Sequence, residues 1–251
     1  MNETLSALYA RKSIRVFEDR PVPEEIRQQI RRAAFEAPTA GNQMLYTILD
    51  ITDPALKARL AVTCDNQLFI ARAPLVWIFV ADCRRWPRMF ELAGAKPRSA
   101  GPGDLLLAMS DACIAAQNAV VAAESLGLGS CYVGDILENC EQHREMLNLP
   151  AGVMPACMLV FGYPTEAQKA RKKPVRFDEK YIVHENGYRD LSDGELREMW
   201  ARSERAENGA VQPFEAALRA FCERKYNSGF SREMSRSVRV YLRDFEDDGK
   251  R

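Results

Sequence analysis

Histidine is scarce in this chain of 251 residues, in which only His143 and His184 are present. The seven cysteines are scattered along the sequence and form no C-x-x-C pair. A histidine-based metal centre, a zinc site and a disulfide framework are therefore not expected. Unpatterned cysteines in odd number indicate reduced thiols, and so predict a cytoplasmic protein without a resident metal.

Net charge is absent as well, because 35 basic and 35 acidic side chains give a formal charge of zero. Nucleic-acid-binding proteins usually carry a basic excess or a basic face, so no nucleic-acid partner is expected. No apolar run is expected to approach the roughly 20 residues that span a bilayer. The first residues, MNETLSALYARKS, lack the apolar core of a secretory signal. A membrane partner is not expected either.

Motifs of hydrolysis are also missing: there is no G-x-S-x-G elbow, no H-E-x-x-H and no Walker lysine. The segment 127–134, GLGSCYVG, is similar to a dinucleotide-binding fingerprint, but that fingerprint follows a strand and opens a helix. Here the glycines follow a predicted helix. They favour a turn into a short strand whose backbone can approach a flat ring closely, with a purely structural turn as the alternative.

Helix and strand signals alternate and predict one α+β domain over residues 1–200, followed by a charged helical arm over residues 201–251. Helices are predicted to end near residue 9 and to span about 21–37 and 104–126, the last rich in alanine. Strands are predicted at 46–51, 75–81 and 154–161. Three prolines and three glycines between residues 84 and 103 predict a loop or lid with a short helix at most.

The segment Arg11-Lys12-Ser13-Ile14-Arg15 places three cations and a hydroxyl within five residues. In an extended chain Arg11, Ser13 and Arg15 project to one face, and a phosphate group requires such a set of donors and positive charges. A second basic cluster follows at Lys169, Arg171, Lys172, Lys173 and Arg176. Each cluster alone is most simply a solvated turn. Two clusters in a neutral protein are what a phosphate dianion would require.

Five segments, in order, resemble the nitroreductase family of flavoproteins, and within it the NADPH-dependent, oxygen-insensitive nitroreductases and flavin reductases. They are ARKSIRVFEDRPVPEE, APTAGNQ, DNQLFIARAP, AAQNAVVAAESLGLGSCYVGD, and GYP followed by the basic cluster and IVHENGY. The resemblance covers about residues 6–190. It implies an α+β fold with a central, mostly antiparallel sheet flanked by helices. It also implies an intertwined homodimer with an FMN in each of two sites at the subunit interface.

The resemblance also implies a set of FMN-binding residues. The phosphate and ribityl chain are expected to be held by Arg11, Lys12, Ser13 and Arg15. The partner subunit is expected to meet the flavin at Pro38, Thr39, Ala40 and Asn42. The ring is expected to lie against Gln67 at its polar edge and against the turn Tyr132, Val133 and Gly134. The second phosphate-binding position falls at Lys173 and Arg176, with Lys172 as the alternative to Lys173 because the family spacing differs here.

Activity follows from the same resemblance, which implies two-electron transfer from NADPH or NADH through flavin N5 to a nitroaromatic, a quinone or free flavin by a ping-pong mechanism. Because the flavin carries the chemistry, no catalytic side chain is expected, and Lys12 and Gln67 are the candidates to stabilise the reduced flavin. The alternatives are a specialised dehalogenase or enone reductase, decided by residues 84–103, and a non-catalytic flavin-binding sensor.

Overall fold

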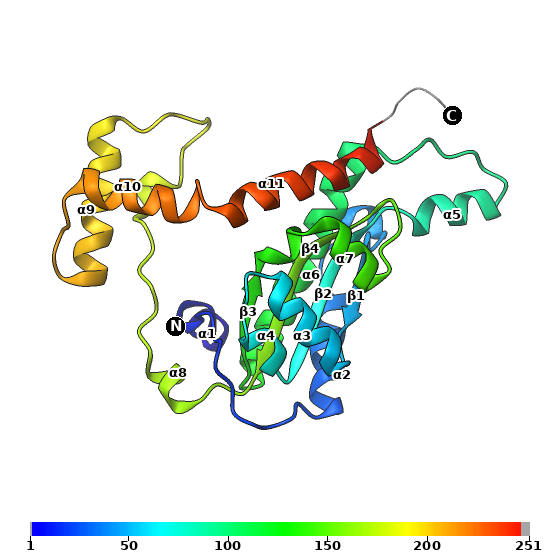
Figure 1. Ribbon diagram of the computed structural model, residues 1–251, viewed down its shortest axis with the longest axis horizontal. Helices are drawn as coiled ribbons and strands as arrows, with labels where there is room; N and C mark the ends of the chain where they lie inside the picture. The colour runs from blue at the N-terminus through cyan, green and yellow to red at the C-terminus, as the bar shows by residue number, and fades with distance from the viewer. Residues whose placement is uncertain (1, 247–251) are drawn as a thin grey trace. The chain divides into compact units, whose positions relative to one another are not determined.

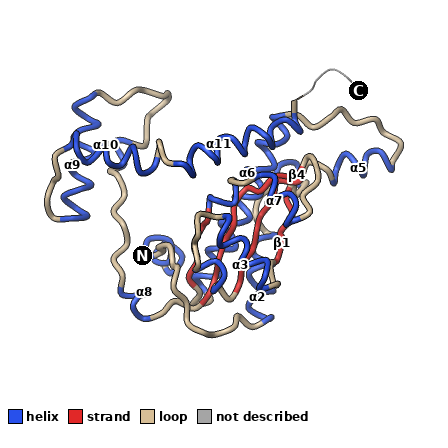
Figure 2. The backbone as a smooth tube through the Cα atoms, viewed as in Figure 1, coloured by secondary structure: helices blue, strands red, loops and turns tan. Residues whose placement is uncertain are grey.

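Four antiparallel strands form the sheet at the centre of the fold, in the order β1-β2-β4-β3. They are β1 (Tyr46–Asp50), β2 (Leu75–Asp82), β3 (Gly129–Val133) and β4 (Val153–Gly162). A computed structural model describes residues 2–246, which divide into two compact units, 2–171 with 233–246, and 172–232. The sheet, whose strands are red in Figure 2, consists of residues of the first unit. The three predicted strands and the short strand after the glycine-rich turn are confirmed.

Helices cover both faces of the sheet in the first unit (Figure 1). One face packs against α2 (Glu24–Phe35) and α6 (Pro102–Ser125), with Trp77, Phe79 and Phe161 buried between them. The other face packs against α3 (Pro54–Thr63), α4 (Phe69–Arg72) and α7 (Cys140–Leu147) through residues such as Ile78 and Val160. Because both faces are covered, the central strands β2 and β4 read as apolar runs in the sequence.

Helix α6 is the longest helix, with 24 residues, and its alanines at 112, 115, 116, 119 and 123 are all fully buried. These small side chains let the helix approach the sheet closely. By length and composition α6 is also apolar enough to cross a membrane, so the expectation that no apolar run approaches that length was wrong. The apolar residues of α6 form part of the protein core, because the buried alanine face packs against the sheet.

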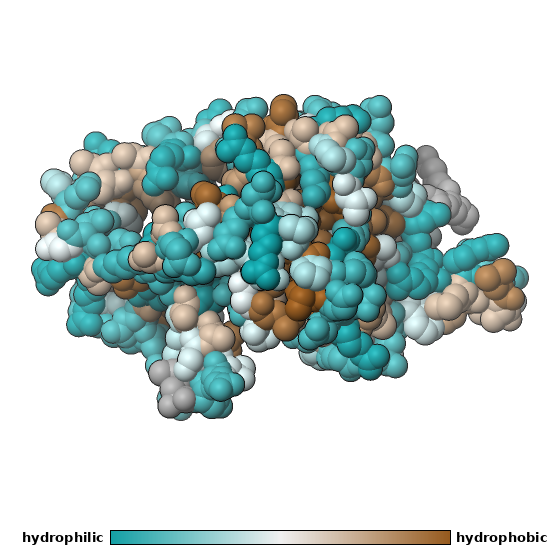
Figure 3. Space-filling model, turned by 90° about the horizontal axis from the view of Figure 1, so that it is seen from below, coloured by the Kyte–Doolittle hydropathy of each residue, from teal (hydrophilic) through white to brown (hydrophobic). Residues whose placement is uncertain are grey.

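The opposite face of α6 is partly apolar as well. Leu106, Leu107 and Ile114 are 69%, 52% and 40% exposed, respectively. Their spacing places them along one side of the helix. Figure 3 shows that apolar side chains reach the surface at several places on an otherwise hydrophilic face.

Segment 84–103 contains one short helix, α5 (Arg85–Leu92), as expected. Pro102 and Gly103, which were assigned to this loop, begin α6 instead, since proline is well accommodated in a first helical turn. The Asp104 carboxylate accepts a hydrogen bond from the Gly101 backbone N–H at 2.8 Å and caps the helix.

The remaining elements of the first unit are α1 (Glu3–Ala10), η1 (Ala40–Asn42), η2 (Gly134–Leu137), α8 (Glu166–Ala170) and η4 (Arg243–Phe245). Helix α11 (Gly229–Leu242) begins in the second unit and continues into the first. In the first unit, Tyr241 and Phe245 are buried in a cluster with Ala81 and Leu105.

The second unit is helical and contains η3 (Glu179–Tyr181), α9 (Asp193–Asn208) and α10 (Phe214–Lys225). The predicted arm, 201–251, contributes residues 201–232 to this unit and residues from Glu233 onward to the first. Residues 247–251, at the acidic end of that arm, lie outside the described residues. The assignment of the arm to a dimer partner stays a prediction.

Candidate functional site

The segment 11–17 runs beside the edge strand β3. Ile14 N–H donates to the Ser130 carbonyl at 2.8 Å, and Ser13 and Ser130 form an isolated parallel bridge. A Cβ atom at Gly129 would lie 2.8 Å from Cβ of Ile14, so glycine is required for this close approach. The extended conformation inferred from the sequence is thus fixed by the sheet edge.

The guanidinium of Arg11 is the most notable polar group in this region. Its Nε and Nη2 atoms are buried and have no hydrogen-bond partner among the described residues. Its Cζ atom lies 5.9 Å from the centre of the Tyr132 ring. Buried donors left without acceptors are costly to a protein, so an anionic ligand beside Tyr132 would satisfy a need that the protein itself leaves unmet.

Glu124 of α6 lines a small cavity together with Arg11. Its Oε1 atom is buried without a hydrogen-bond partner in the described chain. Burial raises the pKa of Glu124 to about 7, against the opposing charges of Arg11 and Lys12. Near neutral pH this carboxyl group is therefore partly protonated and partly ionised. In its ionised form it would compete with an anion for Arg11.

Lys12 connects the first basic segment to the end of α8. Its Nζ donates to the Lys169 carbonyl at 2.6 Å and to the Arg171 carbonyl. The Arg171 guanidinium donates in turn to the Ser13 carbonyl, and the Arg15 N–H donates to Gln168 Oε1 at 3.4 Å. The first cluster and the beginning of the second therefore lie together. Lys172, Lys173 and Arg176 belong to the second unit, and their role as phosphate ligands stays a prediction.

Gln67 lies just before α4 and uses both hydrogens of its side-chain amide within the protein. Nε2 donates to the Cys64 carbonyl at 2.9 Å and to Asp135 Oδ2 at 2.7 Å. Its Oε1 atom is left as the group that a ligand can use, and it can only accept a hydrogen bond. Arg15 lies in the same region, because its Cζ is 5.8 Å from the ring centre of Phe69 in α4.

The predicted ring-binding turn is at the end of β3. The Tyr132 hydroxyl donates to Gln117 Oε1 of α6 at 3.3 Å, and burial raises the pKa of this phenol, so it is neutral. Val133 is buried, whereas Gly134 is exposed with open space where a side chain would project. Three chain segments therefore meet around β3 and bring together Arg11, Ser13, Arg15, Gln67 and the turn.

The helix exit at Pro38–Asn42 is held elsewhere, by the buried carboxylate of Asp111. Asp111 accepts from the Thr39 hydroxyl, from Ala40 N–H at 3.0 Å and from Leu45 N–H at 3.1 Å. Asp111 precedes Glu124 by 13 residues on α6, which is about 20 Å along the helix axis at 1.5 Å per residue. Within one chain, Thr39 and Ala40 are therefore remote from the carboxyl that lines the Arg11 cavity.

The expectations from sequence did not include Asp111, Glu124 or Asp135. A lone aspartate inside the apolar stretch LLLAMSDACIAA was the available signal for Asp111, since a charge that is buried in a helix requires partners. For Glu124 and Asp135 there was no local signal, because their partners are distant in the sequence.

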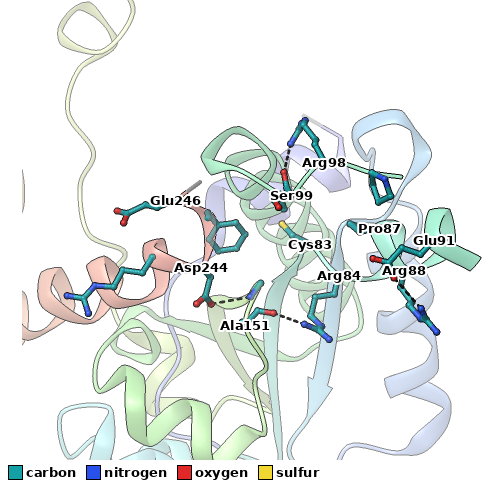
Figure 4. A pocket seen from close by; sticks show the side chains of 15 residues that line it. Cys83, Arg84, Pro87, Arg88, Glu91, Arg98, Ser99, Ala151, Asp244 and Glu246 are labelled. Atoms are coloured by element: carbon teal, nitrogen blue, oxygen red, sulfur yellow. Dashed lines mark hydrogen bonds and ion pairs between the residues drawn. The ribbon is translucent and has the colours of Figure 1, made fainter. Parts of the chain in front are cut away.

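Segment 84–103 borders several cavities of the first unit, and its residues make up most of the lining of two of them. One, of about 470 Å³, lies between this segment and η4; it is shown in Figure 4, where Cys83, Arg84, Arg98 and Asp244 are among the lining side chains. The second, of about 370 Å³, is lined by Trp86, Phe90 and Leu107. Neither is lined by a residue assigned to FMN, and the role of this segment in shaping an acceptor pocket stays a prediction.

The sheet with helices on both faces defines an α+β protein. Along its edge strand runs an arginine-containing segment, in which Arg11 has buried nitrogens without a partner among the described residues and lies beside the Tyr132 ring. A model of the nitroreductase family matches residues 8–163. The chain belongs to the nitroreductase family, as the resemblance indicated.

Individual proteins agree with this assignment. The chain is similar to the oxygen-insensitive NADPH nitroreductase of Salmonella typhimurium, with 36% identity over 194 residues that cover 77% of this chain and 78% of the relative. It is similar to the FMN reductase [NAD(P)H] of Bacillus subtilis, with 30% identity over 96% of this chain and 91% of the relative. The solved structure of NfrA2 from B. megaterium superimposes with a TM-score of 0.82 at 29% identity, and 97% of each chain is covered.

Proposed function

We propose that this protein is an FMN-dependent oxidoreductase that uses NADPH or NADH to reduce nitroaromatic compounds, quinones or free flavin. The observation that carries the proposal is the guanidinium of Arg11 beside the Tyr132 ring, in which two buried nitrogens have no partner among residues 2–246. Relatives that bear the names NADPH nitroreductase and FMN reductase supply the chemical class of the ligand.

The residues around β3 fit FMN. Arg11 and the Ser13 side chain would bind the phosphate end, and the turn at residues 132–134 would lie against the ring. When bound, FMN would supply the chemistry of hydride acceptance and hydride donation. The protein contributes position and charge, and no nucleophile or general base is required.

The choice of charged group at the polar edge of the ring follows from the hydrogen bonds within the protein. Lys12 Nζ is bound to two backbone carbonyls, and the Gln67 amide hydrogens are both donated. Arg15 is exposed, and its guanidinium lies by Phe69, two residues from Gln67. We therefore assign the stabilising positive charge to Arg15, and to Gln67 Oε1 the role of acceptor for a ring N–H.

We further propose that two copies of the chain form the functional unit. The exposed face of α6 carries Leu106, Leu107 and Ile114. Exposure of these apolar side chains to water is unfavourable, and a second copy would cover them. Within one chain the Thr39–Asn42 loop is bound to Asp111, away from the Arg11 cavity. A second copy would bring its own Thr39–Asn42 loop to the site. All seven cysteines are free, which supports a reducing, cytoplasmic location.

The test begins with the visible spectrum of the purified protein and continues with anaerobic addition of NADPH. We expect a flavin spectrum that bleaches. Replacing both Arg11 and Arg15 with alanine should give folded but colourless protein, with at least a tenfold loss of FMN affinity because each charge-assisted contact contributes about 1.5–3 kcal/mol.

The matched control is Arg32→Ala, which removes an exposed arginine of α2 that pairs with Glu36, and it should retain its flavin. Undiminished FMN content in the double variant would contradict both the assignment of Arg11 to the phosphate and that of Arg15 to the ring. Bound FMN that is not reduced by NADPH or NADH would favour a flavin-binding sensor instead.

A further inference from the structure

We infer that Asp135 and Glu138 are a positioning pair that shares one proton and holds Gln67 in place for the flavin, so that flavin binding weakens when this proton is lost. The inference rests on the proposed function. It concerns two acidic side chains that the FMN-binding set inferred above does not include.

Asp135 is hydrogen-bonded to both of the other residues. Asp135, in η2 directly after the ring-binding turn, accepts a hydrogen bond from Gln67 Nε2 at 2.7 Å. The backbone N–H of Glu138 donates to the Asp135 carbonyl at 3.0 Å. This tight turn brings the two carboxyl groups so close that, after burial, a hydrogen bond with Asp135 is the next cause that raises the pKa of Glu138. Two carboxyl groups can make that contact only when one of them carries a proton.

The surroundings of Glu138 do not favour a charge on its carboxyl group. The residue is only 4% exposed, and its Oε1 atom has no hydrogen-bond partner among the described residues. An isolated ionised carboxylate is strongly disfavoured in such a place. Burial, and next the hydrogen bond with Asp135, raise the pKa of Glu138 to about 8.

The groups on the surrounding elements do not offset this effect. Asp65, after α3, and Glu233, on α11, are both negative and raise the pKa of Glu138 further. The nearby cation is Arg236, which is bound to Glu233 at 2.8 Å and to Glu141 at 2.7 Å.

Two other titratable groups adjoin the pair. Burial lowers the pKa of His143 on α7 and keeps the imidazole neutral, while its ring nitrogens contact Thr63 Oγ1 and the Ile136 carbonyl. Burial raises the pKa of Cys64, so that its thiol is also neutral. Neither group supplies a positive charge to the carboxyl pair.

The sign of the pH effect follows from these contacts. Below about pH 8 the protonated Glu138 donates to Asp135, and Asp135 stays fixed as the acceptor for Gln67. Above that pH, Glu138 gives its proton to water and two adjacent carboxylates repel each other. The orientation of Gln67 is then less well defined, and FMN affinity falls as pH rises.

The experiment measures FMN dissociation constants of the flavin-free protein by fluorescence between pH 6.5 and pH 9.5. We expect the dissociation constant of the wild type to rise about tenfold across pH 8, the order expected for one linked proton over one pH unit. Glu138→Gln should remove the rise near pH 8, because an amide donates to Asp135 at every pH, and should leave only the smaller rise near pH 7 that ionisation of Glu124 causes. Glu145→Gln, at an exposed position of α7, is the matched control and should keep the wild-type profile.

The same pH dependence in Glu138→Gln and in the wild type would overturn the inference, as would a flat profile in the wild type. Urea unfolding of the flavin-free proteins separates this failure from failure of the proposed function. The stability of the wild type relative to Glu138→Gln should decline from about pH 5 to pH 8 and then level off, because the folded state retains a proton that the unfolded state releases. If the protein shows this stability profile but does not bind FMN, the proton between Glu138 and Asp135 is supported. The proposed role in flavin binding is then refuted.

Discussion

Among single residues, the glycines beside the edge strand have the narrowest tolerance. A Cβ atom on Gly162 would lie 2.8 Å from Cγ of Phe17 and 2.8 Å from Cδ of Pro74. A ring and a proline cannot withdraw as the end of a flexible side chain can. Gly129 and Gly162 therefore determine how closely segment 11–17 approaches the sheet.

We predict that Gly129→Ala destabilises the protein by about 1–3 kcal/mol, since the added methyl group overpacks against Ile14. Urea denaturation measures the change, and FMN content should fall with it. Gly103→Ala is the control, because open space surrounds this glycine in the first turn of α6. Equal stability of the two variants would show that Ile14 does not pack as described.

A second residue-scale prediction concerns Glu124, whose pKa lies at about 7. At pH 8 its carboxylate is mostly ionised and opposes the flavin phosphate beside Arg11. Glu124→Gln should tighten FMN binding roughly fivefold at pH 8, a gain of about 1 kcal/mol that is reasonable for one charge pair near the surface. The ratio of dissociation constants between variant and wild type should approach one at pH 5.5, where Glu124 is neutral.

The same titration with Glu25→Gln, at an exposed position of α2, provides the control and should give a ratio near one throughout. Weaker binding in Glu124→Gln at pH 8 would mean that the carboxylate supports Arg11 and does not compete with the ligand.

At the scale of elements, Asp111 connects α6 to the loop that precedes β1. We predict that Asp111→Asn destabilises the protein by about 2 kcal/mol. The asparagine side chain cannot accept from all three donors, and its NH2 group would face a backbone N–H group. Thermal or urea unfolding measures this change. Asp53→Asn, at the N-cap of α3, should cost much less because asparagine caps helices well.

The elements that the sequence predicted best are those with continuous or periodic apolar patterns, namely β1, β2, β4, α2 and α6. Among the shorter helices, α1 and the short helix within residues 84–103 were predicted, whereas α3, α4 and α7 were not. For α3 a signal existed, since Asp53 and Pro54 form a good helix start. For α7 there was little, because Asn139 precedes it with a left-handed φ of 49° and no side-chain cap.

The candidate site divides in the same way. The basic segment and the glycine-rich turn could be found locally, because they carry distinctive residues within a few positions. The contacts of Asp111 with Thr39 and of Asp135 with Gln67 join residues 72 and 68 positions apart. Such pairs depend on how the sheet brings distant segments together, which composition and periodicity do not report.

At the scale of the whole molecule, the proposed pairing of two chains gives a direct prediction. Replacing both Leu106 and Leu107 with glutamate should convert dimers to monomers, since two charges on the exposed face of α6 would have to be buried without partners. Light scattering measures the mass, and FMN content should fall in parallel if each site needs the second copy.

Val62→Glu, at a residue that is 60% exposed on α3, is the matched control and should leave both properties unchanged. A wild-type protein that is monomeric and fully loaded with FMN would rule out the shared site.

The bridge between Ser13 and Ser130 also has a consequence for the order in which the chain folds. Its two residues are 117 positions apart, so the basic segment can join β3 only after α6 and the sheet have brought that strand into place, and long-range contacts of this kind are slow to form. Refolding followed in time should therefore show helix and sheet formation before flavin binding is recovered. Until then the outer side of β3 presents unpaired backbone groups, through which partly folded chains can associate.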